Sequence, residues 1–199
     1  MSSGEEKAWS ILRDLAPADV CRNAMAGFDE ATGTYLLKSF GMDISVDPAE
    51  KRIYSDSLGS DLLLERLGYF SKLSVLWYMV SARDIPLSGK LVQPTNLKGG
   101  HIFFRGTHVL PLDKLASRYG KDAAGFLKRG RDLGGKQLSY GDASVELFPF
   151  PRIPVALILW QEDEEFPSRA DILFDSTCEF HLALDILWTT AMESLLIMM

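Results

Sequence analysis

The stretch Ile153–Phe174, IPVALILWQEDEEFPSRADILF, decides the fold of the last third of the chain. Val155–Trp160 is an apolar run without alternation, which is typical of a strand buried on both faces. A second strand is predicted at Ala170–Phe174, beyond the acidic segment Gln161–Pro167. We therefore predict a β-hairpin that turns through Gln161–Pro167, with its first strand, from Ile153 to Trp160, at the centre of a sheet.

The sequence on both sides of this hairpin adds a strand and a helix. The run Ser144–Phe148 predicts the preceding strand. After the hairpin, Ser176–Glu179 matches the capping box, in which a Ser hydroxyl and a Glu carboxylate satisfy free backbone donors of a first helical turn. A helix is expected to begin there, to break near His181 and to resume through Leu184–Ile197.

The first half of the chain predicts a small β-meander and one long helix. Met42, Ile44 and Val46 alternate with polar residues, and this period of two is typical of a strand with one buried face. From Ser60, a candidate N-cap, apolar residues three or four positions apart predict a helix over Asp61–Ala82. The other predicted elements are strands at Thr34–Phe40, Arg52–Ser55 and Ile102–Phe104, and helices at Glu5–Leu15, Pro17–Phe28, Leu112–Tyr119 and Asp122–Leu133.

Together these elements predict an α+β protein. Mixed or antiparallel sheets, an N-terminal meander and a C-terminal hairpin, are expected to pack against a long central helix and a C-terminal helix. With 199 residues, 47% hydrophobic and 24% charged, the chain has the length and composition of one globular domain spanning residues 1–199. No internal repeat or linker-like stretch indicates a boundary within it.

Bulk properties exclude several classes of protein. A net charge of -6 argues against nucleic-acid binding, which depends on clustered Lys and Arg. Cys21 and Cys178 are widely separated, as is normal in a reducing compartment. Met1–Glu6 lacks the features of a signal peptide, and the apolar C-terminal stretch contains Asp185 and Glu193, which are costly in a bilayer. We expect a cytoplasmic protein that neither binds nucleic acid nor enters a membrane.

The irregular segment Gly99–His108 is the first candidate site. Arg105 presents a planar fork of donors suited to carboxylate or phosphate, and His108 can titrate near neutrality. If His101 and Arg105 flank a strand, they share one face. We therefore expect Arg105, His108 and His101 to bind a ligand. The alternative is that Arg105 pairs with an acid and both histidines bond to backbone carbonyls. Two histidines without a nearby carboxylate form an incomplete metal site.

The hairpin turn is the second candidate site. It contains the consecutive acids Glu162, Asp163, Glu164 and Glu165. Clustered carboxylates can bind calcium or magnesium, but this spacing matches no EF-hand loop. We predict instead a solvated tip whose acids could contact a basic partner, and we predict no metal site. Phe166–Pro167 is expected to anchor the turn to the body of the protein.

Two further arrangements could carry chemistry. Asp171 and Asp175 are four residues apart and hence on one face of a strand, where they could act as paired acid and base. Alternatively, Asp175 caps the following helix and Asp171 is exposed. Cys178 and His181 could form a nucleophile and base, although a buried structural Cys178 is the other interpretation. No hydrolase motif such as GxSxG, SxxK or HExxH occurs, so the catalytic residues stay unknown.

Several short patterns together resemble the uncharacterised family catalogued as domain of unknown function 3786, found mostly in anaerobic bacteria and archaea. The likeness covers about residues 62–199. The patterns are Pro86–Gly89, Gly99-Gly100, Phe104–Gly106, Pro151–Pro154, Leu159-Trp160, Asp163–Pro167 and Leu173–Asp175. The resemblance brings no catalytic residues. It implies a link to anaerobic redox or one-carbon metabolism, because some relatives join this domain to a cysteine-rich iron–sulfur module; this chain lacks those cysteines.

The sequence favours two functions from different classes. The first is a small-molecule or cofactor-binding accessory domain in anaerobic redox or one-carbon metabolism, with Gly99–His108 lining the pocket and Arg105 holding an anionic group. Its cofactor is unknown. The alternative is a protein-interaction module that docks the acidic hairpin on a redox or corrinoid-dependent partner.

Overall fold

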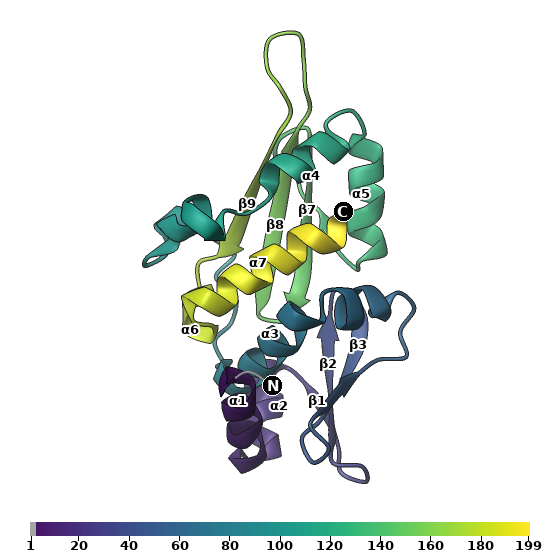
Figure 1. The fold of residues 1–199 in the computed structure, drawn as a ribbon, viewed down its shortest axis with the longest axis vertical. Helices are drawn as coiled ribbons and strands as arrows, with labels where there is room; N and C mark the ends of the chain where they lie inside the picture. Colours follow the sequence, from purple (N-terminus) through teal and green to yellow (C-terminus); the bar gives the residue numbers. More distant parts are fainter. Residues whose placement is uncertain (1–2) are drawn as a thin grey trace.

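The computed structural model describes residues 3–199. Its N-terminal part combines two helices with an antiparallel meander in the strand order β1-β2-β3-β4 (Figure 1). The three predicted strands of the meander are confirmed, and a short first strand, β1, joins them. The elements are α1 (Ser3–Asp14), α2 (Pro17–Ala24), β1 (Gly27–Asp29), β2 (Thr34–Ser39), β3 (Met42–Asp47) and β4 (Arg52–Tyr54).

The C-terminal part contains a five-stranded sheet in the order β5-β9-β8-β7-β6, and every neighbouring pair is antiparallel. β8 has its predicted bounds, lies at the centre of the sheet and is buried up to its last residue. β8 and β9 form the predicted hairpin, so the α+β fold is confirmed. The strands are β5 (Leu91–Val92), β6 (Lys136–Gln137), β7 (Ala143–Phe150), β8 (Ile153–Trp160) and β9 (Arg169–Asp175).

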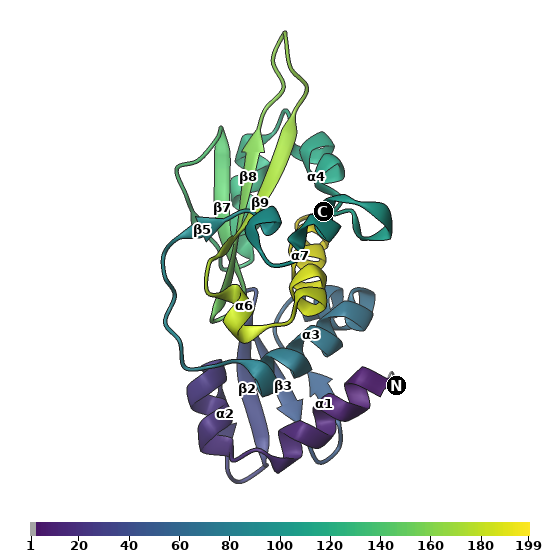
Figure 2. The same ribbon diagram turned by 90° about the vertical axis from the view of Figure 1, so that its left-hand side faces the viewer.

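Helices cover one face of the five-stranded sheet, with α4 and α7 on the same side of it (Figure 2). α3 packs between α1 and α7, which makes it the central helix. The apolar α7 is a core helix, as most of its side chains are buried. The helical elements are η1 (Leu62–Arg66), α3 (Gly68–Ser81), η2 (Pro94–Asn96), η3 (Gly100–Phe104), η4 (Gly106–His108), α4 (Leu112–Tyr119), α5 (Ala123–Asp132), α6 (Cys178–His181) and α7 (Leu184–Met198).

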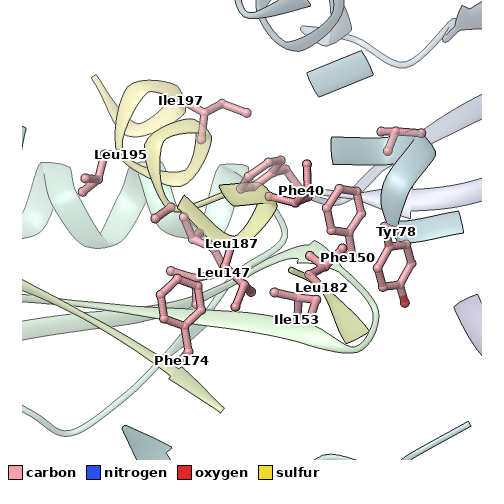
Figure 3. Packing of buried hydrophobic residues seen from close by; sticks show 14 of the residues in the cluster. Phe40, Tyr78, Leu147, Phe150, Ile153, Phe174, Leu182, Leu187, Leu195 and Ile197 are labelled. Atoms are coloured by element: carbon pink, nitrogen blue, oxygen red, sulfur yellow. The ribbon is translucent and has the colours of Figure 1, made fainter. Parts of the chain in front are cut away.

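Side chains from both parts meet in one hydrophobic core (Figure 3). The Tyr78 ring stacks on Phe150 with 4.5 Å between centroids. The buried Tyr78 hydroxyl donates a hydrogen bond to the carbonyl of Ala24 over 2.9 Å. At the sheets' junction, the backbone N–H of Phe40 donates to the carbonyl of Phe148 over 2.8 Å. These contacts connect α2, α3, the meander and the five-stranded sheet.

Arg152, in the turn between β7 and β8, is a buried arginine that joins three segments. Its guanidinium donates to the carbonyls of Asn23, Arg22 and Ile85 and forms a 2.6 Å ion pair with Asp84. The side chain therefore links the end of α2, the segment after α3 and the sheet.

The long helix predicted over Asp61–Ala82 is interrupted. A π-helical turn, η1, precedes α3, and the chain bends at Leu67, whose N–H donates to the carbonyl of Leu62 five residues earlier. The Ser71 hydroxyl donates to the carbonyl of Leu63 across the bend. Ser60 is not an N-cap, because its hydroxyl donates to the carbonyl of Ser55 instead.

Three other sequence predictions were wrong in detail. α2 ends at Ala24 rather than continuing to Phe28, because Met25 adopts a left-handed conformation with φ of 53°. The strand predicted at Ile102–Phe104 is part of the 3-10 helix η3. The predicted capping box does not form, since the Glu179 carboxylate accepts from the backbone of Lys98 instead.

Candidate functional site

The exposed face of α3 forms the floor of a groove. Tyr69, Leu73, Trp77 and Ser81 recur every four residues along the helix, so they share one face. α1 packs on one side of α3 and α7 on the other. Leu73 borders three adjoining hollows of this groove, with volumes of about 420, 550 and 200 Å³. We call this surface the α3 groove.

The hollow of about 420 Å³ lies between the ends of α1, α3 and α6 and the start of α7. Its walls combine aromatic and aliphatic side chains with a few charged groups, which is the usual make-up of a small-molecule site. The side chains that give it this character are Trp77, Phe180, Ile186, Arg83, Asp185 and His181.

His181 supplies the one buried histidine of this hollow, with 1% of its surface exposed. Its Nδ1 accepts a hydrogen bond from the backbone N–H of Arg83 over 3.3 Å, so the ring proton lies on Nε2. Burial, followed by the nearby charge of Arg152, lowers the pKa of His181 to about 4. The ring is therefore neutral near pH 7, and among residues 3–199 its Nε2–H finds no partner.

The hollow of about 200 Å³ lies where the loop after α3 returns to α7. His108 borders it together with Phe70 and Ile102. The indole N–H of Trp188 donates to the carbonyl of His108 over 2.6 Å, and the two rings meet edge to face at 5.1 Å. This contact fixes the end of the predicted loop against α7 at the edge of the α3 groove.

The structure separates the three residues predicted to bind a ligand. Only His108 borders the α3 groove. His101 and Arg105 are exposed in and after η3, and they share no strand face, because that segment is a 3-10 helix. Arg105 forms no ion pair within the described part of the chain, so the pairing alternative is not seen there either.

The acidic hairpin projects from the end of the sheet that lies away from α3 (Figures 1 and 2). Glu162 forms a 2.9 Å ion pair with Lys121. The Asp163 carboxylate accepts from the backbone of Glu165 and Phe166 and so closes its own turn. Phe166 does not anchor the turn, because 66% of its surface is exposed. The hairpin tip and the Arg105 loop therefore do not form a common site.

Asp175 is a buried structural carboxylate. It accepts from the backbone N–H groups of Ser88, Gly89 and Thr177 and from the hydroxyls of Ser88 and Thr177. Burial raises its pKa, but these hydrogen bonds outweigh burial and lower it overall. Asp175 therefore holds the turn before α6 together, but it does not cap the helix itself, as one sequence interpretation had expected, because its bonds reach no further than Thr177. Asp171 lies on the same face but is half-buried rather than exposed.

Cys178 is not an activated nucleophile. It is buried, and burial together with the charge of Glu179 raises its pKa to about 12. A thiolate is needed for nucleophilic attack, so this environment suppresses it. Its predicted base, His181, uses Nδ1 for the backbone of Arg83 instead.

Two absences hold for residues 3–199. No group of three or more His, Cys, Asp and Glu side chains is arranged to hold a metal ion. None of the described helices has the length and apolar character needed to cross a bilayer.

Sequence reasoning missed the α3 groove because it treated α3 only as a core helix. The available signal was the spacing of Tyr69, Leu73 and Trp77, with the charged Lys72 beside them on an otherwise apolar helix. The sequence did not indicate that α1 and α7 form the sides of this groove, since these helices come from distant parts of the chain.

Comparison with known proteins gives one result. The family profile described as "Domain of unknown function (DUF3786)" matches residues 16–195. The likeness therefore begins well before the region of residues 62–199 that the short patterns indicated, and it includes the meander. Neither the curated proteins nor the solved structures give a significant match.

Proposed function

Because the chain belongs to the family described as domain of unknown function DUF3786, whose description states no activity, we propose a function from its geometry: a small-molecule or cofactor-binding accessory domain. The ligand lies in the α3 groove. The proposal moves the site from the Gly99–His108 loop to the helix surface that the end of this loop borders.

The observation that carries the proposal is the buried, unpaired Nε2–H of His181, a residue that lines the 420 Å³ hollow. A buried donor without a partner costs roughly 1–3 kcal/mol, so buried donors are almost always paired. This nitrogen is itself closed off from solvent, so a carbonyl or other acceptor on a bound molecule would supply the missing partner after a small shift of the side chains that cover it.

The groove walls indicate the rest of the ligand. Trp77 and Phe180 line one hollow, and Trp188 and His108 line the neighbouring one. Aromatic walls favour a flat or apolar body over a highly charged one. We therefore propose a planar, largely apolar molecule that carries at least one hydrogen-bond acceptor.

Titration with two probes tests this proposal. Iron protoporphyrin IX represents planar cofactors, and anilinonaphthalene sulfonate represents smaller apolar anions. Quenching of tryptophan fluorescence reports binding, since Trp77 and Trp188 border the groove. We expect saturable binding of at least one probe and its loss in Leu73→Arg, which places a long charged side chain at the centre of the groove.

The matched control is Leu58→Arg, the same substitution at a leucine that is 100% exposed outside the groove. It should bind as the unaltered chain does. If Leu73→Arg and Leu58→Arg bind the probes equally, the α3 groove is not the site. Arg105→Ala tests the loop separately: unchanged affinity would remove Arg105 as the holder of an anionic group.

We further propose a metabolic role and a cellular location for this protein. The family resemblance supports a role in anaerobic redox or one-carbon metabolism. Two free, widely separated cysteines, Cys21 and Cys178, support a place in the cytoplasm.

The second candidate function is a protein-interaction module. The supporting observation is the projecting hairpin, whose tip exposes Glu164, Glu165 and Phe166 beyond the body of the protein (Figure 1). An exposed ring beside carboxylates suits a partner surface that is basic with an apolar centre. We propose a redox or corrinoid-dependent protein as this partner.

A pulldown from an anaerobic lysate tests the second candidate. The bait is compared with a variant in which Glu162, Asp163, Glu164 and Glu165 are changed to Ser, and with Phe166→Ser alone. Partners that depend on the hairpin should be lost from both variants and weakened by salt. Equal recovery with all three baits would exclude the hairpin as the docking surface.

A further inference from the structure

Glu193 is a buried carboxyl group at the contact between α3 and α7. Only 1% of the residue is exposed, and its Oε2 lies 2.9 Å from the hydroxyl oxygen of Ser74 on α3. The same hydroxyl lies 3.1 Å from the carbonyl oxygen of Ser71 and has one proton to share between the two acceptors. The other carboxyl oxygen, Oε1, has no hydrogen-bond partner among residues 3–199. The polar surroundings of this acid are therefore too few to stabilise a negative charge.

No cation compensates Glu193 from the elements packed against α7, which are α3, η1, α4, α5, α6 and β7. It forms no ion pair within the described residues, and no neighbouring charge contributes to its pKa. The charged residues of α3, η1 and α4 are exposed, as are those of α5 apart from Arg129 and of α6 apart from His181.

The less exposed titratable groups of these elements are engaged elsewhere. Glu146 of β7 lies on the sheet face away from the helices, because its neighbour Val145 is the one that contacts α5. Cys178 of α6 keeps its proton, since burial raises its pKa to about 12. The remaining groups bond to backbone: Tyr78 to Ala24, Tyr119 to Met198, Arg129 to Ile197 and His181 to Arg83.

Glu193 is stable in this position only while it keeps its proton. A carboxylate that is buried without a cation or a full set of donors is strongly destabilised. Loss of the proton therefore favours any arrangement in which water reaches the carboxylate. Glu193 lies on the face of α7 that contacts Ser74 of α3, so water reaches it when these two helices move apart.

The start of α3 is bent beside this contact. The π-helical turn η1 precedes the bend, and the Ser71 hydroxyl donates to the carbonyl of Leu63 across it over 2.7 Å. Turns of this kind interrupt the regular helical ladder and are frequent at functional sites. Ser74 follows Ser71 by less than one helical turn, so the bend lies next to the contact with Glu193.

The same two helices border the α3 groove. Leu73 and Trp77 lie on either side of Ser74 along α3 and line the groove from that helix. Ile186 and Trp188 line it from α7. A movement of α7 away from α3 therefore changes the distance between the walls of the groove.

We propose that Glu193 makes the α3 groove a pH-sensitive site. While Glu193 keeps its proton, α7 stays packed on α3 and the groove keeps the form described above. When the proton is lost, α7 moves away from α3, water enters beside Ser74 and the groove loses affinity for its ligand. The inference rests on the proposed function, since it concerns the same groove, but the movement of the helices is measurable without a ligand.

Tryptophan fluorescence of the ligand-free chain, measured from about pH 6.5 to pH 9, tests the movement. Trp77 and Trp188 report from α3 and α7. We expect one transition near pH 8, because burial raises the pKa of Glu193 to about 8, and no transition in Glu193→Gln, which cannot ionise. Ser74→Ala removes the hydroxyl that favours the charged form, so it should move the transition to higher pH.

Glu146→Gln is the matched control. Burial also raises the pKa of Glu146, but this residue lies outside the contact between α3 and α7. Its variant should keep the transition of the unaltered chain, with the same midpoint. The absence of a transition in the unaltered chain, or a transition that persists in Glu193→Gln, would overturn the inference.

Titration with anilinonaphthalene sulfonate at about pH 7 and pH 9 tests the effect on the groove. Only the fraction of molecules that keeps the proton binds, so the affinity of the unaltered chain should fall by about tenfold at the higher pH. In Glu193→Gln it should change by less than about twofold. Equal affinity of the unaltered chain at both pH values would also overturn the inference. Failure of the probe to bind at either pH would instead contradict the proposed function, and the fluorescence transition would still decide whether the helices move.

Discussion

Glu193 is a carboxyl group in the middle of α7 with a single hydrogen-bond partner. Its Oε2 accepts from the Ser74 hydroxyl of α3 over 2.9 Å, while Oε1 has no partner in the described chain. Burial raises the pKa of Glu193 to about 8, and the bond from Ser74 only partly opposes this. The residue is therefore protonated in the folded protein near pH 7 and ionised in the unfolded chain.

The raised pKa of Glu193 makes a prediction about stability. The folded state holds this proton more tightly than the unfolded chain does. Glu193 therefore makes its full contribution to the free energy of unfolding below the unfolded pKa of 4.5, and this contribution is lost as the pH rises toward about 8. Glu193→Gln keeps the shape without the ionisation. It should be more stable than the unaltered chain at pH 8, by on the order of 2–4 kcal/mol, and the gain should shrink at pH 5.

Urea unfolding at the two pH values measures this difference. Glu164→Gln, at the exposed hairpin tip, is the control and should show no such pH-dependent gain. A Glu193→Gln protein that is equally stabilised or destabilised at both pH values would contradict a buried, proton-holding Glu193.

Replacement of the buried Arg152 is expected to destabilise the protein, in contrast to Glu193→Gln. Its guanidinium satisfies the carbonyls of Asn23, Arg22 and Ile85 at once. Arg152→Met keeps much of the side-chain volume but leaves these acceptors without their donors, so we expect destabilisation of about 3–5 kcal/mol. Thermal unfolding of Arg152→Met measures the loss. Arg83→Met, at an exposed position with no side-chain partner in the described structure, should change stability by less than about 1 kcal/mol.

Two helical glycines show how packing decides whether a helix position can accept a larger side chain. Gly68 begins α3, and a Cβ added there would meet nothing closer than Lys72 at 3.9 Å. Gly130 lies within α5, where the added Cβ would approach Val145 of β7 to 2.6 Å. Both are equally poor helix formers, yet only Gly130 is required by the contact between α5 and the sheet.

The matched pair Gly68→Ala and Gly130→Ala tests this at the scale of the element. Gly68→Ala should stabilise the protein by about 0.5–1 kcal/mol, because alanine loses less backbone entropy in a helix. Gly130→Ala should destabilise it, by about 1–3 kcal/mol, since α5 must move away from β7. Denaturant midpoints of the two variants should thus shift in opposite directions; a shift of both in the same direction would show that helix propensity rather than packing dominates.

At the scale of the whole molecule, Glu193 and His181 set the pH dependence of stability together. The pKa of His181 is lowered from 6.5 to about 4, so its contribution is full above pH 6.5 and is lost as the pH falls toward 4. Between about pH 4.5 and 6.5 the two groups act in opposite directions. Above pH 6.5 the loss from Glu193 continues without this opposition. Burial also raises the pKa of Glu146, so its contribution has the same sign as that of Glu193.

We therefore expect the free energy of unfolding to change little between about pH 4.5 and 6.5 and to fall between about pH 6.5 and 8. Urea denaturation across this range gives the profile. In His181→Asn, whose side-chain oxygen can still accept from Arg83, stability should instead fall from pH 4.5 upward. A plateau that survives in His181→Asn would contradict the assigned role of this histidine.

The sequence by itself determined the elements whose burial pattern is written along one segment. The apolar run Val155–Trp160 specifies a central strand, the acidic stretch after it specifies a turn, and the periodicity of α3 and α7 specifies buried helices. Burial is continuous along the strand and follows apolar residues along the helices, so local sequence is sufficient to predict it.

Only the tertiary structure decided which side chains meet. The α3 groove combines residues as far apart as Gly4 and Ile186, and the bond from Arg83 to His181 joins two other distant segments. No spacing in the sequence encodes such contacts. The same holds for the residues predicted in the loop: the sequence brought Arg105 and His108 close along the chain, but packing of Trp188 on His108 brought only one of them to the groove. Local periodicity specifies the elements, whereas the packing of distant elements creates cavities and leaves particular donors unpaired.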